Sequence, residues 1–312
     1  MILGMESSFI DQISLALGFD YGYQFRALLS IVLVTLVCGM VGVMVVGNRM
    51  AFFSDAMAHC AFAGVALGVL LTLAIGSPKD RETHHWMVPL VMVSFGALVG
   101  LAIAYVREKT DLASDTVIGV FFAGAIGFGA MLLSALKHRK AIDPDTFLFG
   151  SPLYVQDIDF LYLIILLVLT IVLLMRRSND LLLASFNPSL AKSRRVAIRM
   201  NNYLFVLLLA LIVNLSIVTV GALLINALLI VPAATASNLS RDLRWMFWLT
   251  LILSVLSGIS GLYLSMNFHL RLGQVQPVEF GPSGTIICVS VIMFFVSMIA
   301  PARRWVKRLK IS

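Results

Sequence analysis

Nine apolar runs, each long enough to cross a bilayer as a helix, constrain the fold of this chain more than any other feature. They cover residues 27–47, 50–75, 87–105, 116–136, 159–175, 203–219, 220–238, 245–265 and 283–302. A helix needs about 20 apolar residues to cross a hydrocarbon core about 30 Å thick. The run ending at Met175 is short, and only Thr219 and Gly221 mark a break within 203–238, so the sequence predicts eight or nine transmembrane helices.

Composition supports the same class. Hydrophobic residues make up 60% of the 312 residues and charged residues 12%, whereas soluble domains have about 45–50% and about 25%. We therefore expect an all-α polytopic membrane protein with one transmembrane domain over residues 1–312. Residues 1–24 lack the pattern of a secretory signal and are expected to lie along the membrane surface.

The stretch 49–68, RMAFFSDAMAHCAFAGVALG, places two ionisable residues in a predicted span. Asp55 and His59 are four residues apart, so both lie on one face of a helix. An ionisable group at the centre of a span costs about 2.5–3.5 kcal/mol and usually marks a substrate path, a proton relay or a fixed partner. Counting about 1.5 Å per residue from Arg49 puts His59 about 15 Å into the membrane.

Two interpretations of this pair follow. A carboxylate oxygen and an imidazole nitrogen are sound ligands for a divalent metal, so Asp55 and His59 are predicted to form a transient metal site in a translocation path. The alternative is that the two residues pair with each other or cap the end of a helix.

Enzyme signatures are absent from the sequence. It contains no HExxH, GxSxG or GxxxxGK[ST] pattern, so it predicts no catalytic residue, no loop for nucleotide phosphates and no permanently bound cofactor. If ATP drives this protein, a separate chain must hold the ATP. The net charge of +7 lies in loops, which suits membrane orientation and implies no nucleic-acid partner.

The remaining candidate ligands carry weaker signals. Cys38, Cys60 and Cys288 have no CxxC or CxxH spacing, so they are interpreted as small core residues. His84 and His85, in KDRETHHW, could bind a metal, but adjacent histidines in a solvated loop are more often polar surface.

Basic residues predict the orientation. If the C-terminus is cytoplasmic, 16 of the 23 lysines and arginines fall on the cytoplasmic side, including the tail 303–310, as the positive-inside rule requires. The largest cytoplasmic loop is then 176–202. Within it, Asn187 can cap a short helix from Pro188 to about Arg195 that could meet a soluble partner. The alternative is a basic connector held at anionic lipid.

Four separated stretches carry a family resemblance. They are RMAFFSDAMAHCAFAGVALG (49–68), SDTVIGVFFAG (114–124), FLFGSPLYV (147–155) and VGALLINALLIVPAATA (220–236), and GPSGTI (281–286) matches a further feature. Together they resemble the permease subunit of metal-ion ABC importers, the zinc/manganese/iron family, most closely its zinc-uptake branch.

The resemblance implies an assembly and a cargo. It implies a permease homodimer in a bacterial inner membrane, a separate ATP-binding subunit, an extracytoplasmic metal-binding protein, and Zn²⁺ as the ion carried into the cytoplasm, with Mn²⁺ or Fe²⁺ as alternatives. The segment matching the coupling helix is 185–196, which makes Ser185, Asn187, Ser189, Leu190 and Ala191 the expected contacts with the ATPase. The competing hypothesis of another class is a secondary transporter driven by an ion gradient, with Asp55 and His59 as proton or sodium sites.

The charge distribution yields a topology prediction. A reporter fused after Ser312 should be cytoplasmic, and the thiol introduced by Thr83→Cys should react with an impermeant reagent applied outside intact cells. A second variant, Ser240→Cys, should react only after the membrane is opened, because residue 240 lies in a predicted cytoplasmic turn. Labelling in the opposite order would contradict the orientation.

Overall fold

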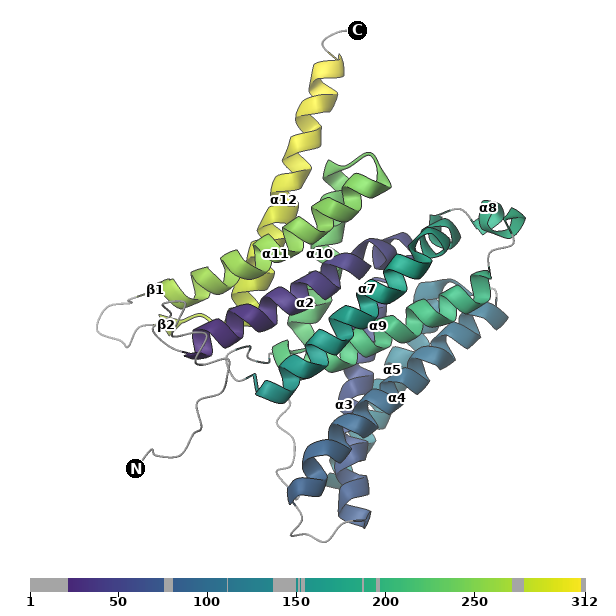
Figure 1. Cartoon of the computed structure of the whole chain (residues 1–312), viewed down its shortest axis with the longest axis vertical. Coiled ribbons are helices and arrows are strands. Elements are labelled where there is room, and N and C mark those ends of the chain that lie inside the picture. The colour runs from purple at the N-terminus through teal and green to yellow at the C-terminus, as the bar shows by residue number, and fades with distance from the viewer. Residues whose placement is uncertain are drawn as a thin grey trace. The chain divides into compact units, whose positions relative to one another are not determined.

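The structure is a computed structural model that describes residues 22–75, 81–110, 112–136, 150, 152, 155–186, 188–194, 197–270 and 278–309. Nine helices in this part of the chain are long and apolar enough to cross a membrane (Figure 1). They are α2 (Gly22–Gly47), α3 (Phe53–Ile75), α4 (Arg81–Lys109), α5 (Ser114–Leu136), α7 (Asp157–Phe186), α9 (Ile198–Val220), α10 (Ala222–Leu239), α11 (Leu243–Asn267) and α12 (Pro282–Leu309). The predicted all-α class and the higher of the two predicted helix counts are confirmed. Most of the predicted interfacial segment, residues 1–24, lies outside the described residues.

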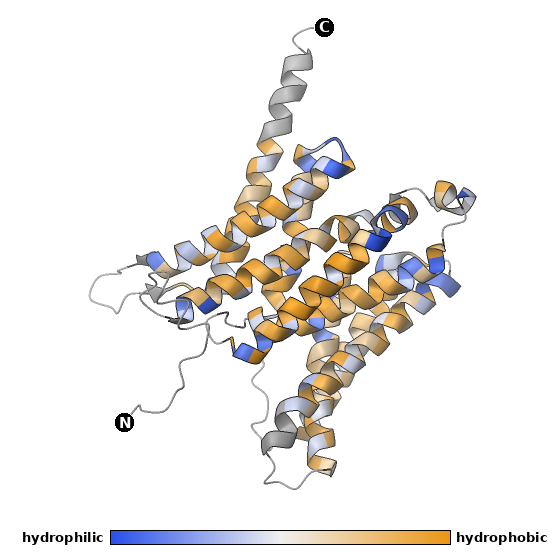
Figure 2. Ribbon diagram, in the orientation of Figure 1, coloured by the Kyte–Doolittle hydropathy of each residue, from blue (hydrophilic) through white to orange (hydrophobic). Residues whose placement is uncertain are grey.

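Polar residues mark where the helices begin and end (Figure 2). α4 carries Arg107 and Lys109 in its last turn, and α5 carries Asp115 in its first turn. Both arrangements place a charge where the helix dipole stabilises it. α7 continues to Phe186, eleven residues beyond the predicted end of that span, because residues 176–186 remain good helix formers after the apolar run stops.

Two features fall between the long helices. The short helix α8 covers Pro188–Ser193, close to the predicted Pro188–Arg195. The strands β1 (His269–Leu270) and β2 (Val278–Glu279) pair antiparallel, with His269 opposite Glu279. The sequence did not predict this hairpin, because two residues are too few to show the alternation that marks a strand.

The chain divides into two compact units. Unit 1 contains residues 1–43, 149–168 and 218–312, and unit 2 contains residues 44–148 and 169–217. Helices α2, α7 and α9 contribute to both units.

Glycines set the helix packing of unit 2. A Cβ on Gly64 of α3 would lie 2.9 Å from the Met92 Cα of α4, and a Cβ on Gly100 of α4 would lie 3.0 Å from the Ala210 Cβ of α9. Gly96, one turn before Gly100, faces the side chain of Asn214. Small residues let helix backbones approach closely in lipid, so the spacings Gly64–Gly68 and Gly96–Gly100 serve helix packing.

Buried hydroxyls join the helices of unit 1. Ser254 Oγ in α11 donates a hydrogen bond of 2.9 Å to the Thr35 carbonyl of α2. α12 buries three serines at seven-residue spacing, Ser283, Ser290 and Ser297, and Asn238 of α10 donates to Ser297 Oγ at 3.2 Å. Interhelical hydrogen bonds of this kind stabilise helix association where lipid gives no hydrophobic drive.

A single residue separates α9 from α10. Gly221 has φ 87° and ψ 158°, a conformation that is essentially restricted to glycine. Gly150, with φ 52°, packs directly on this break: a Cβ on Gly150 would lie 2.6 Å from the Val220 carbonyl carbon. Ser283 Oγ donates to the Val220 carbonyl at 3.3 Å. The predicted break near Gly221 is therefore real, and two glycine backbones and one hydroxyl form it.

Substitution at this break should destabilise the protein. Gly221→Ala forces an L side chain into a strained conformation, which costs about 1–3 kcal/mol, and thermal unfolding in detergent should show a lower midpoint. Gly284→Ala is the matched control, because nothing lies within 4 Å of a Cβ at Gly284. Equal unfolding midpoints for the two variants would contradict the assignment.

Candidate functional site: the start of α3 and its surroundings in unit 2

The structure places Asp55 and His59 on one helix, and this helix begins four residues after Arg49. α3 begins at Phe53, so Asp55 lies in its first turn and His59 one turn further on. Residues 48–52 form a turn rather than the start of the span. The six steps along the helix from Phe53 to His59 correspond to about 9 Å. The predicted 15 Å counted helix from Arg49 and therefore included the turn, and the depth of His59 in a membrane stays a prediction.

The turn before α3 is held by a Schellman motif that ends α2. The Met50 amide donates to the Val45 carbonyl at 3.0 Å, and the Arg49 amide donates to the Val46 carbonyl at 3.1 Å. Arg49 has φ 54°, in a position where glycine is usual. Met50 and Phe53 are fully buried. These contacts fix where α3 starts and therefore where Asp55 lies.

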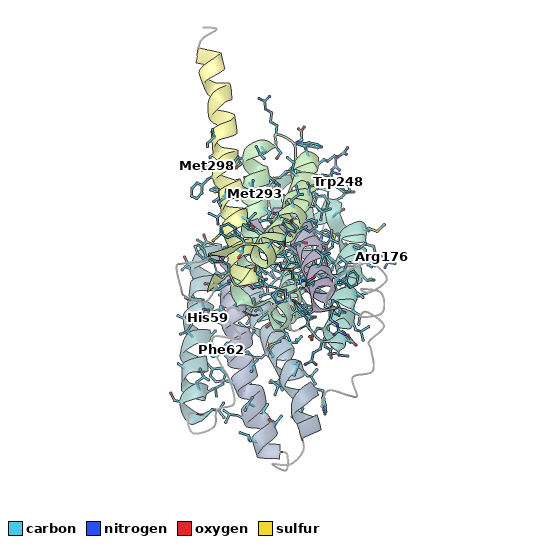
Figure 3. The ribbon with its side chains drawn as sticks, turned by 90° about the vertical axis from the view of Figure 1, so that its left-hand side faces the viewer. His59, Phe62, Arg176, Trp248, Met293 and Met298 are labelled. Carbon is cyan, nitrogen blue, oxygen red and sulfur yellow. The ribbon has the colours of Figure 1, made fainter. Side chains whose placement is uncertain are left out.

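His59 is held by an aromatic ring from α5. The imidazole of His59 and the ring of Phe122 meet edge to face, with centroids 4.9 Å apart and planes at 88°. Such pairs have a preferred geometry, so Phe122 limits the orientations of the imidazole. His59 is half-buried, and Phe62 lies three residues further along α3 (Figure 3).

The location of Asp55 also serves the helix itself. A carboxylate in the first turn interacts favourably with the helix dipole, worth about 0.3–1 kcal/mol at an exposed position. This position agrees with the capping interpretation, which stays a prediction.

The pair alone does not make a closed metal site. Within the described part of the chain, no group of three or more histidine, cysteine, aspartate or glutamate residues is arranged to hold a metal ion. A structural zinc site needs four ligands, so Asp55 and His59 by themselves do not form one. Cys60 and Cys38 are buried and Cys288 is exposed, so the prediction of core positions holds for two of the three cysteines.

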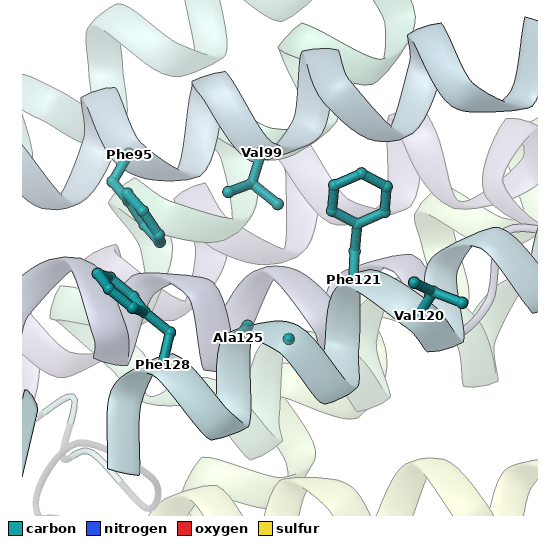
Figure 4. A pocket seen from close by; sticks show the side chains of 7 residues that line it. Phe95, Val99, Val120, Phe121, Ala125 and Phe128 are labelled. Carbon is teal, nitrogen blue, oxygen red and sulfur yellow. The ribbon is translucent and has the colours of Figure 1, made fainter. Parts of the chain in front are cut away.

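A cavity in unit 2 is chemically unsuited to a metal (Figure 4). It lies between α4 and α5, has a volume of about 400 Å³, and is lined by Phe95, Val99, Val120, Phe121, Gly124, Ala125 and Phe128. Phe95 and Phe128 stack across it with centroids 5.7 Å apart. None of these side chains offers an oxygen, nitrogen or sulfur ligand, so the cavity suits hydrocarbon and not an ion.

The predicted coupling residues lie at α8 and its approach. Leu190 is 41% exposed, whereas Ala191 is fully buried. Ser185 and Ser189 have backbone positions in α7 and α8, but their side chains, like all of Asn187, lie outside the described residues. α8 therefore exposes the apolar side chain of Leu190 and packs against the protein through Ala191. The side chains of His84 and His85, at the start of α4, also lie outside the described part.

The five sequence stretches that stand out as motifs meet in two places. Stretches 49–68 and 114–124 meet in unit 2, where His59 contacts Phe122. Stretches 147–155, 220–236 and 281–286 meet in unit 1, through the contact of Gly150 with Gly221 and the bond from Ser283 to Val220. Sequence reasoning missed the second meeting, although the glycine in each of the three stretches was a possible signal.

Comparison with known proteins gives consistent matches. The model of the ABC 3 transport family matches residues 20–301. The manganese import system permease protein ScaB of Streptococcus gordonii is 30% identical over 292 residues, which are 93% of this chain and 95% of that protein. The high-affinity zinc uptake system membrane protein ZnuB of Haemophilus influenzae is 30% identical over 274 residues, 88% and 96% of the two chains. A solved structure, PsaBC from Streptococcus pneumoniae in complex with Fab, has a TM-score of 0.72 and 27% identity and covers 97% of this chain and 99% of that chain.

Proposed function

This chain belongs to the ABC 3 transport family, and on that premise we propose that it carries a divalent transition metal ion into the cytoplasm. It is the permease of a metal ABC importer. The observation that supports the proposal best is the Asp55–His59 pair on the fixed start of α3. The pair supplies one oxygen and one nitrogen ligand on a helix of a nine-span protein.

The pair suits passage better than storage. A site that conducts an ion must bind it well enough to replace lost hydration and weakly enough to release it. Two protein ligands, with water or a second permease copy completing the shell, meet both needs. The edge-to-face contact with Phe122 presents the imidazole of His59 in a limited range of orientations.

We propose Zn²⁺ as the cargo, with Mn²⁺ or Fe²⁺ as alternatives. The relatives' names do not decide between zinc and manganese, because proteins of equal identity carry manganese and zinc names. The zinc proposal rests on the sequence resemblance to the zinc-uptake branch, because zinc, manganese and ferrous iron all accept a carboxylate and an imidazole.

The energy source and partners follow from the family. The sequence has no loop for nucleotide phosphates, so the proposal assigns ATP hydrolysis to a separate subunit and the transport path to this chain. The proposed assembly is a permease homodimer with two ATPase subunits and an extracytoplasmic metal-binding protein, in a bacterial inner membrane with the C-terminus inside. Family membership favours this assembly over a transporter driven by an ion gradient.

The metal site is tested in the complete transporter reconstituted in lipid vesicles. His59→Ala and Asp55→Ala should each lower ATP-dependent zinc uptake by about 10–100-fold or more, because loss of even an outer-shell partner of a metal site costs that much. Competition with Mn²⁺ and Fe²⁺ in the same vesicles identifies the preferred ion.

Asp159→Ala is the matched control for the metal site, because Asp159 is also an acid in the first turn of a span and its carboxylate accepts a hydrogen bond from the nearby Gln156 amide. It should retain uptake. Wild-type uptake by both α3 variants, with normal insertion and assembly, would remove the pair from the path.

The coupling role of α8 has its own test. Leu190→Asp places a charge where the exposed apolar side chain should enter the ATPase, so uptake should fall and the complex should dissociate more readily on size-exclusion chromatography. Leu190→Met keeps an apolar side chain of similar volume and should behave as wild type. If Leu190→Asp left both assembly and uptake intact, α8 would be a connector at the lipid surface.

A further inference from the structure

We propose that the last turn of α4, at Arg107 and Glu108, is the positioning element that links the coupling region to the start of the metal-site helix α3. The inference rests on the proposed function, because it concerns how the docked region and the Asp55–His59 pair act together. All residues that carry it belong to unit 2.

The first contact joins α4 to the chain that leaves α8. Arg199 is the second residue of α9 and follows α8 by six residues. Its Nε lies 2.8 Å from Glu108 Oε1. The Arg199 side chain is 84% exposed and that of Glu108 21%. Exposed ion pairs of this kind contribute little to stability, so stability alone does not explain this one.

A second contact ties the same end of α9 to α7, the helix that leads into α8. Arg177 Nη1 donates to Asn201 Oδ1 at 3.4 Å. Asn201 is 1% exposed, and its Nδ2 is buried without a hydrogen-bond partner. α7 and α9, the helices before and after α8, are therefore joined near Arg199. A displacement of α8 would move α7 and α9 together, and the Arg199–Glu108 ion pair would pass this movement to α4.

The third contact joins α4 to the turn before α3. Arg107 Nη1 donates to Met50 Sδ at 3.0 Å, and Met50 is fully buried. A thioether is a weak acceptor, and a guanidinium held on one is unusual. Its geometric effect is to attach the last turn of α4 to a fully buried side chain of the α2–α3 turn.

The backbone continues the link from Met50 to the metal pair. The Met50 carbonyl accepts the Phe53 amide at 3.0 Å, and the Met50 amide is bonded to Val45. Phe53 is the first residue of α3, and Asp55 lies two residues later. Arg107 and Glu108 are adjacent in one turn of α4. Arg107 contacts the turn before α3, and Glu108 contacts the start of α9, which follows the proposed coupling helix α8.

Charge exchange tests the Glu108–Arg199 contact. In the complete reconstituted transporter, Glu108→Arg and Arg199→Glu should each lower the amount of zinc taken up per ATP hydrolysed by about 2- to 30-fold, the range for residues that carry coupling between sites. Thermal unfolding and copurification of the ATPase should be unchanged. The double variant Glu108→Arg/Arg199→Glu should restore the ratio, and the unchanged unfolding of the single variants separates this loss from a structural one.

Matched controls separate the link from general charge effects. Lys109→Glu makes the same change of charge as Arg199→Glu and lies on the same turn of α4 as Glu108. The interaction described for Lys109 is with the Tyr105 ring, 6.0 Å from its Nζ. The uptake-to-hydrolysis ratio of this variant should therefore stay at its wild-type value. Met50→Leu removes the sulfur acceptor and keeps the volume, and should lower the ratio. Met92→Leu, at another fully buried methionine of unit 2, should not.

The outcomes are distinct from those for the proposed function. If wild-type vesicles take up no zinc with ATP, the proposed function fails and not the link. If the wild type transports and both charge variants keep its uptake-to-hydrolysis ratio, the link is overturned. It is also overturned if both singles lower the ratio and the double variant does not recover it.

Discussion

The structure depends on the requirement that backbone polar groups in hydrocarbon be bonded within the protein. Each unpaired group in the membrane costs several kcal/mol, so the apolar runs become helices and every break needs special chemistry. The α9–α10 break meets this requirement locally: Gly221 takes a conformation closed to other residues, Gly150 packs on it, and the Ser283 hydroxyl caps the Val220 carbonyl. Three distant sequence stretches therefore meet at one point.

Much of the fold could be predicted from periodicity and length alone. The centres of the nine spans and the break near Gly221 follow directly from apolar runs and a glycine. The end of α7 and the start of α3 could not be predicted, because hydropathy reports where a span leaves lipid and not where a helix ends. The hairpin of β1 and β2 left no pattern, since each strand has only two residues.

Helix periodicity made part of the candidate site predictable as well. The i, i+4 spacing of Asp55 and His59 defines a shared helix face once a helix exists, and that part needed no coordinates. The edge-to-face partner Phe122 and the anchor Met50 required tertiary structure, because Phe122 comes from another helix and Met50 is held by Arg107. Sequence showed which residues could bind the ion, and only the structure showed what orients them.

These contacts place Asp55 and His59, the proposed metal ligands, near the start of a helix whose first turn is held by residues of other helices. α3 starts after a Schellman motif in which Arg49 takes a position usual for glycine, and its anchor Met50 is buried and bonded to Arg107. A ligand in the middle of a helix moves only with the whole helix. A ligand in the first turn, such as Asp55, also responds to the residues that hold the turn before it. A pair with open coordination positions, on a helix start with these attachments, is therefore suited to an ion that must be released once in each transport cycle.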